Sequence, residues 1–559
     1  MSTHASSLTL NNVGLTWPDG SVALSGISAT FGRGRTGLVG LNGSGKSTLL
    51  RLLTGQLTPT SGTITTNGDV GYLPQTLTLD VQATVASLLG IRGAVDALRA
   101  IDAGDVSIAN FDAVGDDWDI ETRAGEVLRA AGFAGTTLAG DLSAEGLDRS
   151  VGELSGGEAV LVAIAGLRLR GAPITLLDEP TNNLDGDARR RLGDLVRTWT
   201  GALIVVSHDT TLLELMDDTA ELRGGTLSIF GGAYSAYRAQ VAQEQAAAQQ
   251  AQRSAEHIVK TEKRQRIEAE TKLAHRGKTA RTDFENKRGS KIVMNQLKTN
   301  AQVSAGKLRA DADSKVTDAR SALDDAESRV RSDEQIHVDL PGLEVAATRR
   351  LAELRGTNRT VIIQGPERVA LTGPNGVGKT RLLESLLPDV PSRGGIAAPA
   401  GRATAVAHTE RIGYLAQRLD RLEEDASVLD NVRAAAPSVS AGDIRNRLAR
   451  FLIRGDAVDR PVRSLSGGER FRVALACLLL ADPPSQLLVL DEPTNNLDLQ
   501  SVDQLVGALS QYRGGLLVVS HDDAFLARLG IATWLALDAD GRLTDVNPPT
   551  LEPVGYGRH

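Results

Sequence analysis

"GLNGSGKS" at residues 40–47 and "GPNGVGKT" at residues 373–380 decide the fold class, because both fit the pattern G-x-x-x-x-G-K-[ST]. The apolar stretches "RTGLVG" and "ERVALTG" lead into these segments, and "STLLRLLTG" follows the first with the composition of a helix. A strand, a glycine-rich turn and a helix in this order form a P-loop, whose backbone N–H groups and helix N-terminus bind phosphate. The sequence therefore predicts two α/β phosphate-binding domains.

Four further segments recur in the same order in the two halves of the chain. "GYLPQ" (71–75) matches "GYLAQ" (413–417), "LSGGE" occurs at 154–158 and 465–469, "DEPTNNLD" at 178–185 and 491–498, and "VVSHD" at 205–209 and 518–522. Offsets between 311 and 342 residues indicate a duplicated domain. The first half has 31 more residues between Gln75 and Ser155 than the second has between Gln417 and Ser466.

Length and composition limit the class of protein. With 559 residues, of which 41% are hydrophobic and 23% charged, the chain has room for two large globular domains and an insert. The single cysteine, Cys477, excludes a disulfide framework and a multi-cysteine zinc site, and its apolar neighbours favour core packing. Because no run of 18 apolar residues and no signal peptide is found, we expect a cytoplasmic protein with no membrane association.

The repeated motifs carry the residue types that nucleotide hydrolysis needs. Lys46 and Lys379 are expected to contact the outer phosphates, and Ser47 and Thr380 to supply hydroxyl groups to Mg²⁺. The octapeptides follow the apolar runs "ITLL" and "LLVL", which read as central strands of a parallel sheet, so their acidic residues would lie at the ligand crevice. The expected roles are Mg²⁺ binding for Asp178 and Asp491, activation of the attacking water for Glu179 and Glu492, and contact with the terminal phosphate for His208 and His521.

"LSGGE" reads as the start of a helix that offers its amides and a serine hydroxyl to an anion, although one domain needs no second phosphate-binding helix. P-loop, Gln, "LSGGE", Asp-Glu, Asn-Leu-Asp and His, in that order, resemble an ATP-binding cassette (ABC) over about four fifths of the chain. In that family two cassettes close head to tail, so that "LSGGE" of one completes the ATP site of the other. The resemblance thus explains the second helix end.

The resemblance implies two complete hydrolytic sites, each of which would bind ATP and Mg²⁺. The first would use Gly40, Asn42, Gly45, Lys46, Ser47, Gln75, Asp178, Glu179 and His208 with Ser466 and Gly468. The second would use Gly373, Asn375, Gly378, Lys379, Thr380, Gln417, Asp491, Glu492 and His521 with Ser155 and Gly157. The same motifs add Gly43, Thr48, Gly156, Glu158, Gly376, Gly467 and Glu469 to the ATP-binding residues. The Mg²⁺ ligands would be Ser47, Gln75, Asp178, Thr380, Gln417 and Asp491, and Asp185 and Asp498 would link the two sites.

One asymmetry concerns the adenine base, which cassettes usually stack on an aromatic residue upstream of the P-loop. Trp17 fits this role in the first cassette, with core packing as the alternative. No aromatic residue lies between Phe284 and Lys379, so the second site lacks such a candidate. Because stacking is a modest energy term, ATP binding itself does not depend on it.

The segment between the cassettes predicts a helical hairpin with a basic tip. Its first part is rich in Ala, Gln, Glu, Lys and Arg, and its returning part has apolar residues at 316, 319, 323, 326 and 330. About 45 residues of helix would reach roughly 65 Å. The glycines of residues 275–308 are candidates for breaking the helices. Residues 260–309 hold 14 basic and 5 acidic residues inside a chain of net charge −8. Such a patch is either a solvated helix face or a phosphate-binding surface, for which the candidates are Lys287, Arg288, Lys291 and Lys298.

Tandem cassettes, a long basic linker and paired "DEPTNNLD" motifs resemble the ABC-F family of translation factors. The family more often has His where this chain has Asn183 and Asn496. The predicted organisation is an α/β cassette over 1–238, a helical linker over 239–330 and a second cassette over 331–559. The 31 extra residues lie where the family has a helical arm, which varies among members.

The resemblance also implies a function. A monomeric ATPase would bind the ribosomal E site, with its linker directed at P-site tRNA, ribosomal RNA and the peptidyl-transferase centre, and would protect the ribosome from an antibiotic. A housekeeping translation factor of the same family is the nearest alternative, and an ATPase subunit of a transporter is a more distant one.

Overall fold

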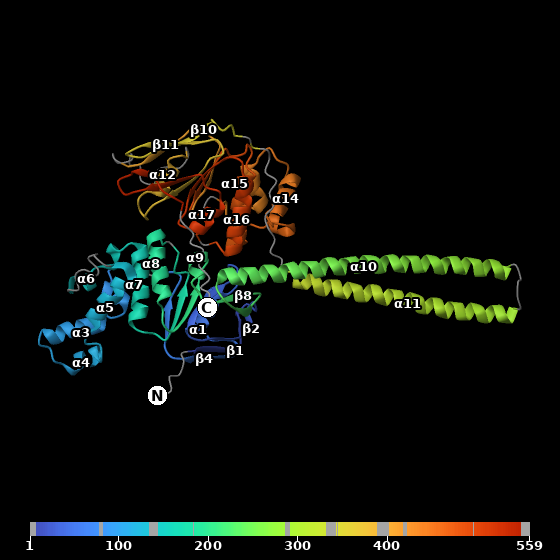
Figure 1. Ribbon diagram of the computed structural model, residues 1–559, viewed down its shortest axis with the longest axis horizontal. Helices are drawn as coiled ribbons and strands as arrows, with labels where there is room; N and C mark the ends of the chain where they lie inside the picture. Colours follow the sequence, from blue (N-terminus) through green and yellow to red (C-terminus); the bar gives the residue numbers. More distant parts are fainter. Residues whose placement is uncertain are drawn as a thin grey trace. The chain divides into compact units, whose positions relative to one another are not determined.

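The computed structural model describes residues 7–77, 82–133, 144–182, 184–285, 291–330, 343, 345–387, 402–417, 422–495 and 497–548. The chain divides into two compact units (Figure 1). One contains both cassettes, residues 1–234 and 334–559, and the other contains residues 235–333.

Each cassette is built on a six-stranded sheet, parallel except for its last strand, and a small antiparallel sheet. In the first cassette the large sheet has the order β5-β6-β7-β3-β8-β9: Val70–Leu73, Ile174–Asp178, Ala202–Val206, Gly34–Val39, Asp218–Arg223 and Thr226–Gly231. The small sheet has the order β2-β1-β4: Val22–Phe31, Ser7–Thr16 and Ser61–Asn67. Every residue of β6 and β7 is buried, because helices cover both faces of a parallel sheet.

The second cassette repeats this topology strand for strand. Its large sheet has the order β14-β15-β16-β12-β17-β18: Ile412–Leu415, Leu487–Asp491, Gly515–Val519, Arg368–Thr372, Thr533–Leu537 and Leu543–Asp545. Its small sheet has the order β11-β10-β13: Thr360–Gln364, Arg350–Arg355 and Thr404–Ala407. The strands predicted from "RTGLVG", "ERVALTG", "ITLL" and "LLVL" are thus confirmed as β3, β12, β6 and β15.

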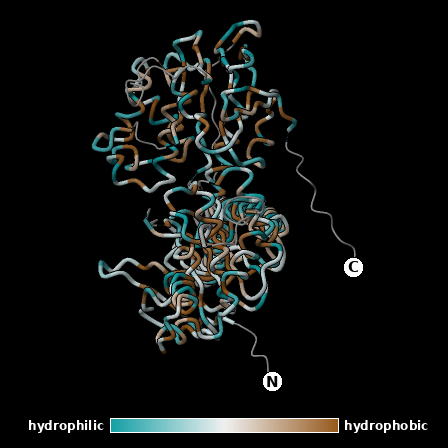
Figure 2. The backbone as a smooth tube through the Cα atoms, turned by 90° about the vertical axis from the view of Figure 1, so that its left-hand side faces the viewer, coloured by the Kyte–Doolittle hydropathy of each residue, from teal (hydrophilic) through white to brown (hydrophobic). Residues whose placement is uncertain are grey.

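Helices follow the motifs at matching places in the two cassettes. They begin after the P-loops at α1 (Lys46–Leu53) and α12 (Lys379–Glu384), and after "LSGGE" at α7 (Gly156–Leu169) and α15 (Gly467–Leu479). The octapeptides lead into α8 (Gly186–Arg197) and α16 (Leu499–Gln511), and the His segments into α9 (Thr210–Leu213) and α17 (Asp523–Arg528). Hydrophobic segments (brown in Figure 2) gather inside the cassettes, with hydrophilic turns at their margins.

The helical regions between β5 and α7, and between β14 and α15, differ in size. The first cassette has α2 (Val85–Leu89), α3 (Arg92–Asp102), α4 (Ile108–Val114), α5 (Ile120–Leu128) and α6 (Ala144–Asp148). In the part that the structure describes, the second has two α-helices, α13 (Val428–Ala435) and α14 (Ala441–Arg450), followed by short 3₁₀ turns at Gly455–Asp459 and Val462–Ser464. Most of the 31 extra residues of the first half therefore form α3 and α4. Phe111 of α4 and Trp118 of the turn that follows it are exposed, with ring centroids 5.8 Å apart.

The second unit is an antiparallel pair of long helices, α10 (Tyr234–Glu285) and α11 (Lys291–Arg329) (Figure 1). Val316, Ala319 and Ala326 are buried and Leu323 and Val330 half-buried, which confirms the predicted apolar spacing. An ion pair of 2.9 Å from Arg266 Nε to Asp313 Oδ1 joins the two helices.

Two details expected of these helices need correction. The helices do not break at Gly277 or Gly306, because both glycines lie inside continuous helix. The third glycine of residues 275–308, Gly289, falls outside the described residues, in the interval from the end of α10 to the start of α11. A glycine costs a helix only about 1 kcal/mol relative to alanine, which good helix formers on either side and the partner helix offset. The 52 residues of α10 consequently span about 78 Å rather than the expected 65 Å. None of the described helices is long and apolar enough to cross a membrane.

Candidate active sites

Both P-loops hold their lysines in the same way. Gly45 and Gly378 stand at the helix N-termini with φ near +100°, a backbone conformation that glycine adopts without a steric penalty. Lys46 Nζ donates to the carbonyl oxygens of Gly40 (2.8 Å) and Leu41 (3.0 Å). Lys379 Nζ donates to those of Gly373 (2.7 Å) and Pro374 (2.9 Å). Each lysine is thus buried against carbonyl oxygens of its own loop, and burial lowers its pKa.

The aspartates at the ends of β6 and β15 lie beside the P-loop hydroxyls. Asp178 is hydrogen-bonded to Ser47, and Asp491 to Thr380. Burial raises the pKa of both carboxyls, and each has one buried oxygen, Oδ1, with no hydrogen-bond partner in the described chain. One free carboxylate oxygen next to a hydroxyl fits Mg²⁺, which is usually held by one or two carboxylates, water and substrate phosphates. Bound Mg²⁺ would neutralise charge on the phosphates, and Asp178 with Ser47, or Asp491 with Thr380, would hold it.

No cluster of three or more His, Cys, Asp or Glu that could hold a metal ion occurs among the described residues. Gln75 and Gln417, the other predicted Mg²⁺ ligands, are exposed two residues after β5 and β14, and their metal contact stays a prediction.

The glutamates that follow these aspartates have strained backbone conformations and carboxyl groups of raised pKa. Glu179 and Glu492 have φ of 50° and 46°, and are among the four non-glycine residues with positive φ in the part of the chain described. Their N–H groups donate to the carbonyl oxygens of Val206 (2.9 Å) and Val519 (2.8 Å), which fixes the turn. Burial is the main cause that raises the pKa of each carboxyl to about 7. A carboxylate with a pKa near the working pH is well matched to accept a proton from water.

A histidine faces each of these glutamates. His208 Nε2 lies 3.0 Å from Glu179 Oε1, and His521 Nε2 lies 3.4 Å from Glu492 Oε1 and 3.0 Å from Lys379 Nζ. Burial, aided by the charge of the P-loop lysine, lowers the pKa of each histidine to about 3. Both imidazoles are therefore neutral at pH 7, and each carries one N–H group and one free nitrogen lone pair beside the reacting groups.

"LSGGE" begins a helix in both cassettes, as predicted. Ser155 and Ser466 cap α7 and α15, and the carboxylates of Glu158 and Glu469 accept hydrogen bonds of 2.8 Å from the serine N–H groups. This capping box gives the two glutamates a structural role. It leaves the amides of the first helical turn available to an anion.

The two cassettes are joined at the helix ends that follow the octapeptides. Asp498 Oδ2 accepts a hydrogen bond of 2.8 Å from the N–H of Asn42, and Asp185 Oδ2 one of 3.4 Å from the N–H of Asn375. The other oxygens of these aspartates cap α16 and α8. Each P-loop is thus bonded to the opposite cassette, as the expected link through Asp185 and Asp498 requires.

For the other predicted residues the expected contacts stay predictions. Trp17 is 38% exposed and follows β1, so its stacking on adenine stays a prediction. Asn183, Asn496, Lys287 and Arg288 lie outside the described residues. Lys291 and Lys298 belong to α11 near the turn of the hairpin.

Sequence reasoning missed two tyrosines that contact the aspartates expected to bind Mg²⁺. Tyr72 Oη donates to Asp178 Oδ2 over 3.4 Å, and Tyr414 Oη to Asp491 Oδ2 over 3.5 Å. Both tyrosines belong to the repeated "GYL" segments, so their recurrence in both halves was the available signal.

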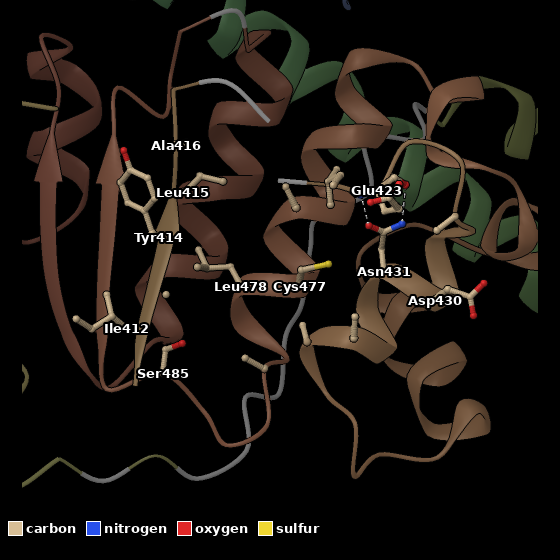
Figure 3. A pocket seen from close by; sticks show the side chains of 17 residues that line it. Ile412, Tyr414, Leu415, Ala416, Glu423, Asp430, Asn431, Cys477, Leu478 and Ser485 are labelled. Carbon is tan, nitrogen blue, oxygen red and sulfur yellow. Dashed lines mark hydrogen bonds between the residues drawn. The ribbon is translucent and has the colours of Figure 1, made fainter. Parts of the chain in front are cut away.

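A cavity of about 630 Å³ lies in the second cassette between α13 and the seam of β14 and α15 (Figure 3). Its walls are mainly apolar and include Leu415, Ala416, Leu478 and Cys477, whose sulfur is seen beside the cavity. Burial raises the pKa of the Cys477 thiol to about 12, so the residue packs as an inert thiol.

Comparison with known proteins agrees with this geometry. The family model described as "ABC transporter" matches residues 24–182 and 357–495. The tylosin resistance ATP-binding protein TlrC of Streptomyces fradiae is 31% identical over 94% of this chain and 96% of its own length. ABC transporter F family member 5 of Arabidopsis thaliana is 28% identical over 89% of this chain and 70% of its own length.

Among solved structures, the archaeal ribosome recycling factor aABCE1 in complex with the stalk protein aP1 shares the fold. Its TM-score is 0.50 at 20% identity, over 94% of this chain and 87% of that chain. The relatives and the two matched cassettes together establish the assignment. The chain belongs to the ABC-F family and is an ATPase with two tandem ATP-binding cassettes.

Proposed function

We propose that this ATPase protects the ribosome from an antibiotic of the kind that its Streptomyces relative resists. The observation that carries the proposal is the similarity to the tylosin resistance protein, which extends over almost the whole of both chains and includes the linker. In this proposal the closed, ATP-bound protein binds the ribosomal E site. The hairpin of α10 and α11 then reaches toward P-site tRNA and the peptidyl-transferase centre.

The charge of the hairpin supports a ribosomal RNA or tRNA partner. Residues 260–309, which surround the turn between α10 and α11, carry 14 basic and 5 acidic residues, whereas residues 310–334 carry 4 basic and 8 acidic residues. Positive charge is thus concentrated toward the turn of a helix pair about 78 Å long. Attraction to phosphate needs only such a local patch, even on a chain of net charge −8.

The first test is binding of the ATP-trapped protein to ribosomes. Glu179→Gln combined with Glu492→Gln is expected to hold ATP in closed cassettes, because the groups that activate water are removed. The double variant should pellet with 70S ribosomes in ATP and stay in the supernatant without nucleotide. If it stays in the supernatant with ATP as well, the ribosomal function is wrong.

The second test separates resistance from a housekeeping role. Tylosin is added to a cell-free translation reaction with and without the wild-type protein. Protection predicts that the protein restores synthesis in tylosin but leaves drug-free synthesis unchanged. Stimulation of drug-free synthesis alone would instead identify a translation factor.

The third test addresses the hairpin. Neutralising Lys287, Arg288, Lys291 and Lys298 to Gln should abolish protection, because phosphate contacts are lost, while ATP hydrolysis without ribosomes is retained. The matched control neutralises the same number of charges far from the turn, at Arg253, Lys315, Arg320 and Arg329. Equal loss of protection in both variants would show that the position of the charge is irrelevant.

A further inference from the structure

The start of the "LSGGE" helix in the second cassette has polar side chains beside it. A Cβ at Gly468 would lie 3.7 Å from Ser501 Oγ and 3.9 Å from Arg472 Nη1. Arg472 stands four residues after Gly468 in α15, one helical turn further along the same face. Its Nε is buried and has no hydrogen-bond partner among the residues that the structure describes. A guanidinium with an unpaired N–H group therefore lies next to the helix end that the sequence predicts to bind an anion.

The same place in the first cassette is apolar. A Cβ at Gly157 would lie 3.3 Å from Leu184 Cδ2 and 3.5 Å from Ala188 Cβ. Four residues after Gly157, α7 has Leu161 in place of the arginine, and this leucine is 1% exposed. The helices that follow the two identical "LSGGE" segments therefore differ by one positive charge at this position.

A chain of contacts runs from Gly468 to the P-loop of the first cassette. The N–H of Ser501 donates to Asp498 Oδ1 (2.8 Å), and the N–H of Asn42 donates to Asp498 Oδ2 (2.8 Å). Burial raises the pKa of Asp498, but hydrogen bonds from Asn42 and Ser501 outweigh burial and hold the pKa below its ordinary value. Asp498 is thus an ionised carboxylate that is only 6% exposed. The polar groups around Gly468 are therefore connected to the P-loop that carries Lys46.

The matching contacts at the other site are longer. The N–H of Ala188 donates to Asp185 Oδ1 over 3.0 Å, and the N–H of Asn375 donates to Asp185 Oδ2 over 3.4 Å. Asp185 is half-buried, and the alanine offers no hydroxyl group. The P-loop that carries Lys379 is thus bonded to the cassette whose "LSGGE" end is apolar.

Arg189 of α8 makes its hydrogen bonds elsewhere. Its Nε donates to the carbonyl oxygen of Leu184 (3.2 Å), and its Nη1 donates to Asp209 Oδ2 (3.4 Å). Asp209 follows His208 and caps α9, so these bonds hold the histidine loop of the first cassette. Among the described residues, a cation within 4 Å of a Cβ built on an "LSGGE" glycine therefore occurs in the second cassette alone.

We propose that Arg472 is a positioning residue for the ATP site built on Lys46, where it holds the "LSGGE" end of the second cassette ready for the ATP phosphates. A partly buried cation strengthens the attraction of this helix end for phosphate, because Coulomb interactions are stronger away from water. The site of Lys46 is therefore the slower of the two to release ATP. The site of Lys379, which has Leu161 in place of the arginine, is the faster.

The inference rests on ATP binding at both sites and is independent of the ribosomal function. Every measurement is made on the free, full-length protein. Its failure would therefore leave the ribosome tests untouched.

Release of labelled ATP tests the inference. With Glu179→Gln and Glu492→Gln in place, neither site is expected to hydrolyse its ATP, and excess unlabelled ATP should release the label in a fast and a slow phase. Arg472→Leu, which copies Leu161, should speed the slow phase about tenfold, because charge-assisted contacts are lost. The fast phase should change less than about twofold.

The rate of hydrolysis gives an independent readout. In the Glu492→Gln background, where the Lys46 site hydrolyses, Arg472→Leu should raise the ATP concentration for half-maximal rate about tenfold. In the Glu179→Gln background it should raise this concentration less than about twofold. Arg472→Lys, which keeps the charge, should recover at least half of the retention time of ATP in the slow phase.

Misfolding would give a different pattern, because the second cassette contributes residues to both sites and both phases would then be faster. Arg463→Leu is the matched control, since it removes a cation that is 66% exposed and lies two residues before "LSGGE". A single release phase in the parent double variant would overturn the proposal. So would equal acceleration of both phases, no acceleration of the slow phase, or an acceleration that Arg463→Leu reproduces.

Discussion

The two cassettes place the same residues around phosphate, yet the helices beside their sheets pack differently. In the first cassette Gly166 of α7 lies so close to α2 that a Cβ there would stand 2.7 Å from Leu89 Cα. The corresponding residue of the second cassette, at the same offset as the "LSGGE" segments, is Cys477, and there α13 and α15 both line a cavity of about 630 Å³. The motifs expected to contact nucleotide are thus shared by the two cassettes, while the helical region around them differs in size and packing.

The largest expected effect tests whether the two sites are equivalent in their chemistry. Glu179→Gln and Glu492→Gln together should reduce steady-state ATP turnover by at least about 100-fold, because general-base catalysis is lost at both sites. Each single change should also reduce turnover strongly, since the cassettes open and close together. Full turnover in either single variant, measured by phosphate release, would contradict two interdependent sites.

The packing difference is tested by adding one methyl group. Gly166→Ala should lower the free energy of unfolding by about 1–3 kcal/mol, because the new Cβ meets the backbone of α2. Cys477→Leu, which adds volume beside a cavity, should change it by less than about 1 kcal/mol. Urea unfolding of both variants measures these changes in the free energy of unfolding. A loss below about 1 kcal/mol for Gly166→Ala would contradict the close packing of α7 on α2.

The two hydrogen bonds between the cassettes are expected to differ less in their contributions to stability. Asp498→Ala should destabilise the protein by about 1–2 kcal/mol through loss of a helix cap and of the 2.8 Å bond to Asn42. Asp185→Ala should cost less, because its bond to Asn375 is longer, at 3.4 Å. Asn in place of either aspartate keeps the cap and serves as the control for the cap alone. Thermal unfolding and ATP turnover should show the same order.

The smallest effect concerns pH. The pKa of Asp522 is raised to about 6 in the folded protein from an ordinary value of 3.8, so the folded state binds this proton more tightly than the unfolded state. Ionisation of Asp522 therefore lowers stability as pH rises from about 4 to about 6. Asp522→Asn, which can still cap α17, should raise the unfolding temperature slightly at pH 8 and leave it unchanged at pH 4. A larger gain in unfolding temperature at pH 4 than at pH 8 would contradict the raised pKa of Asp522.

The sequence predicted the P-loops, the strands before them, the helices after "LSGGE" and the apolar seam of the hairpin. These features are local, because glycine positions, capping residues and apolar spacing act within a few residues of each other. It did not predict the continuity of α10 and α11 through Gly277 and Gly306. Nor did it predict the tyrosine contacts to the aspartates, which join segments 106 and 77 residues apart.

By itself, then, the sequence determined that two cassettes, each with the full set of repeated motifs, are linked by a basic helical segment. Only the tertiary structure decided how these sets differ in their surroundings. The close packing at Gly166 and the cavity beside Cys477 both depend on which helices meet. Such contacts join residues far apart in the chain, and the packing of whole elements rather than any local pattern fixes them.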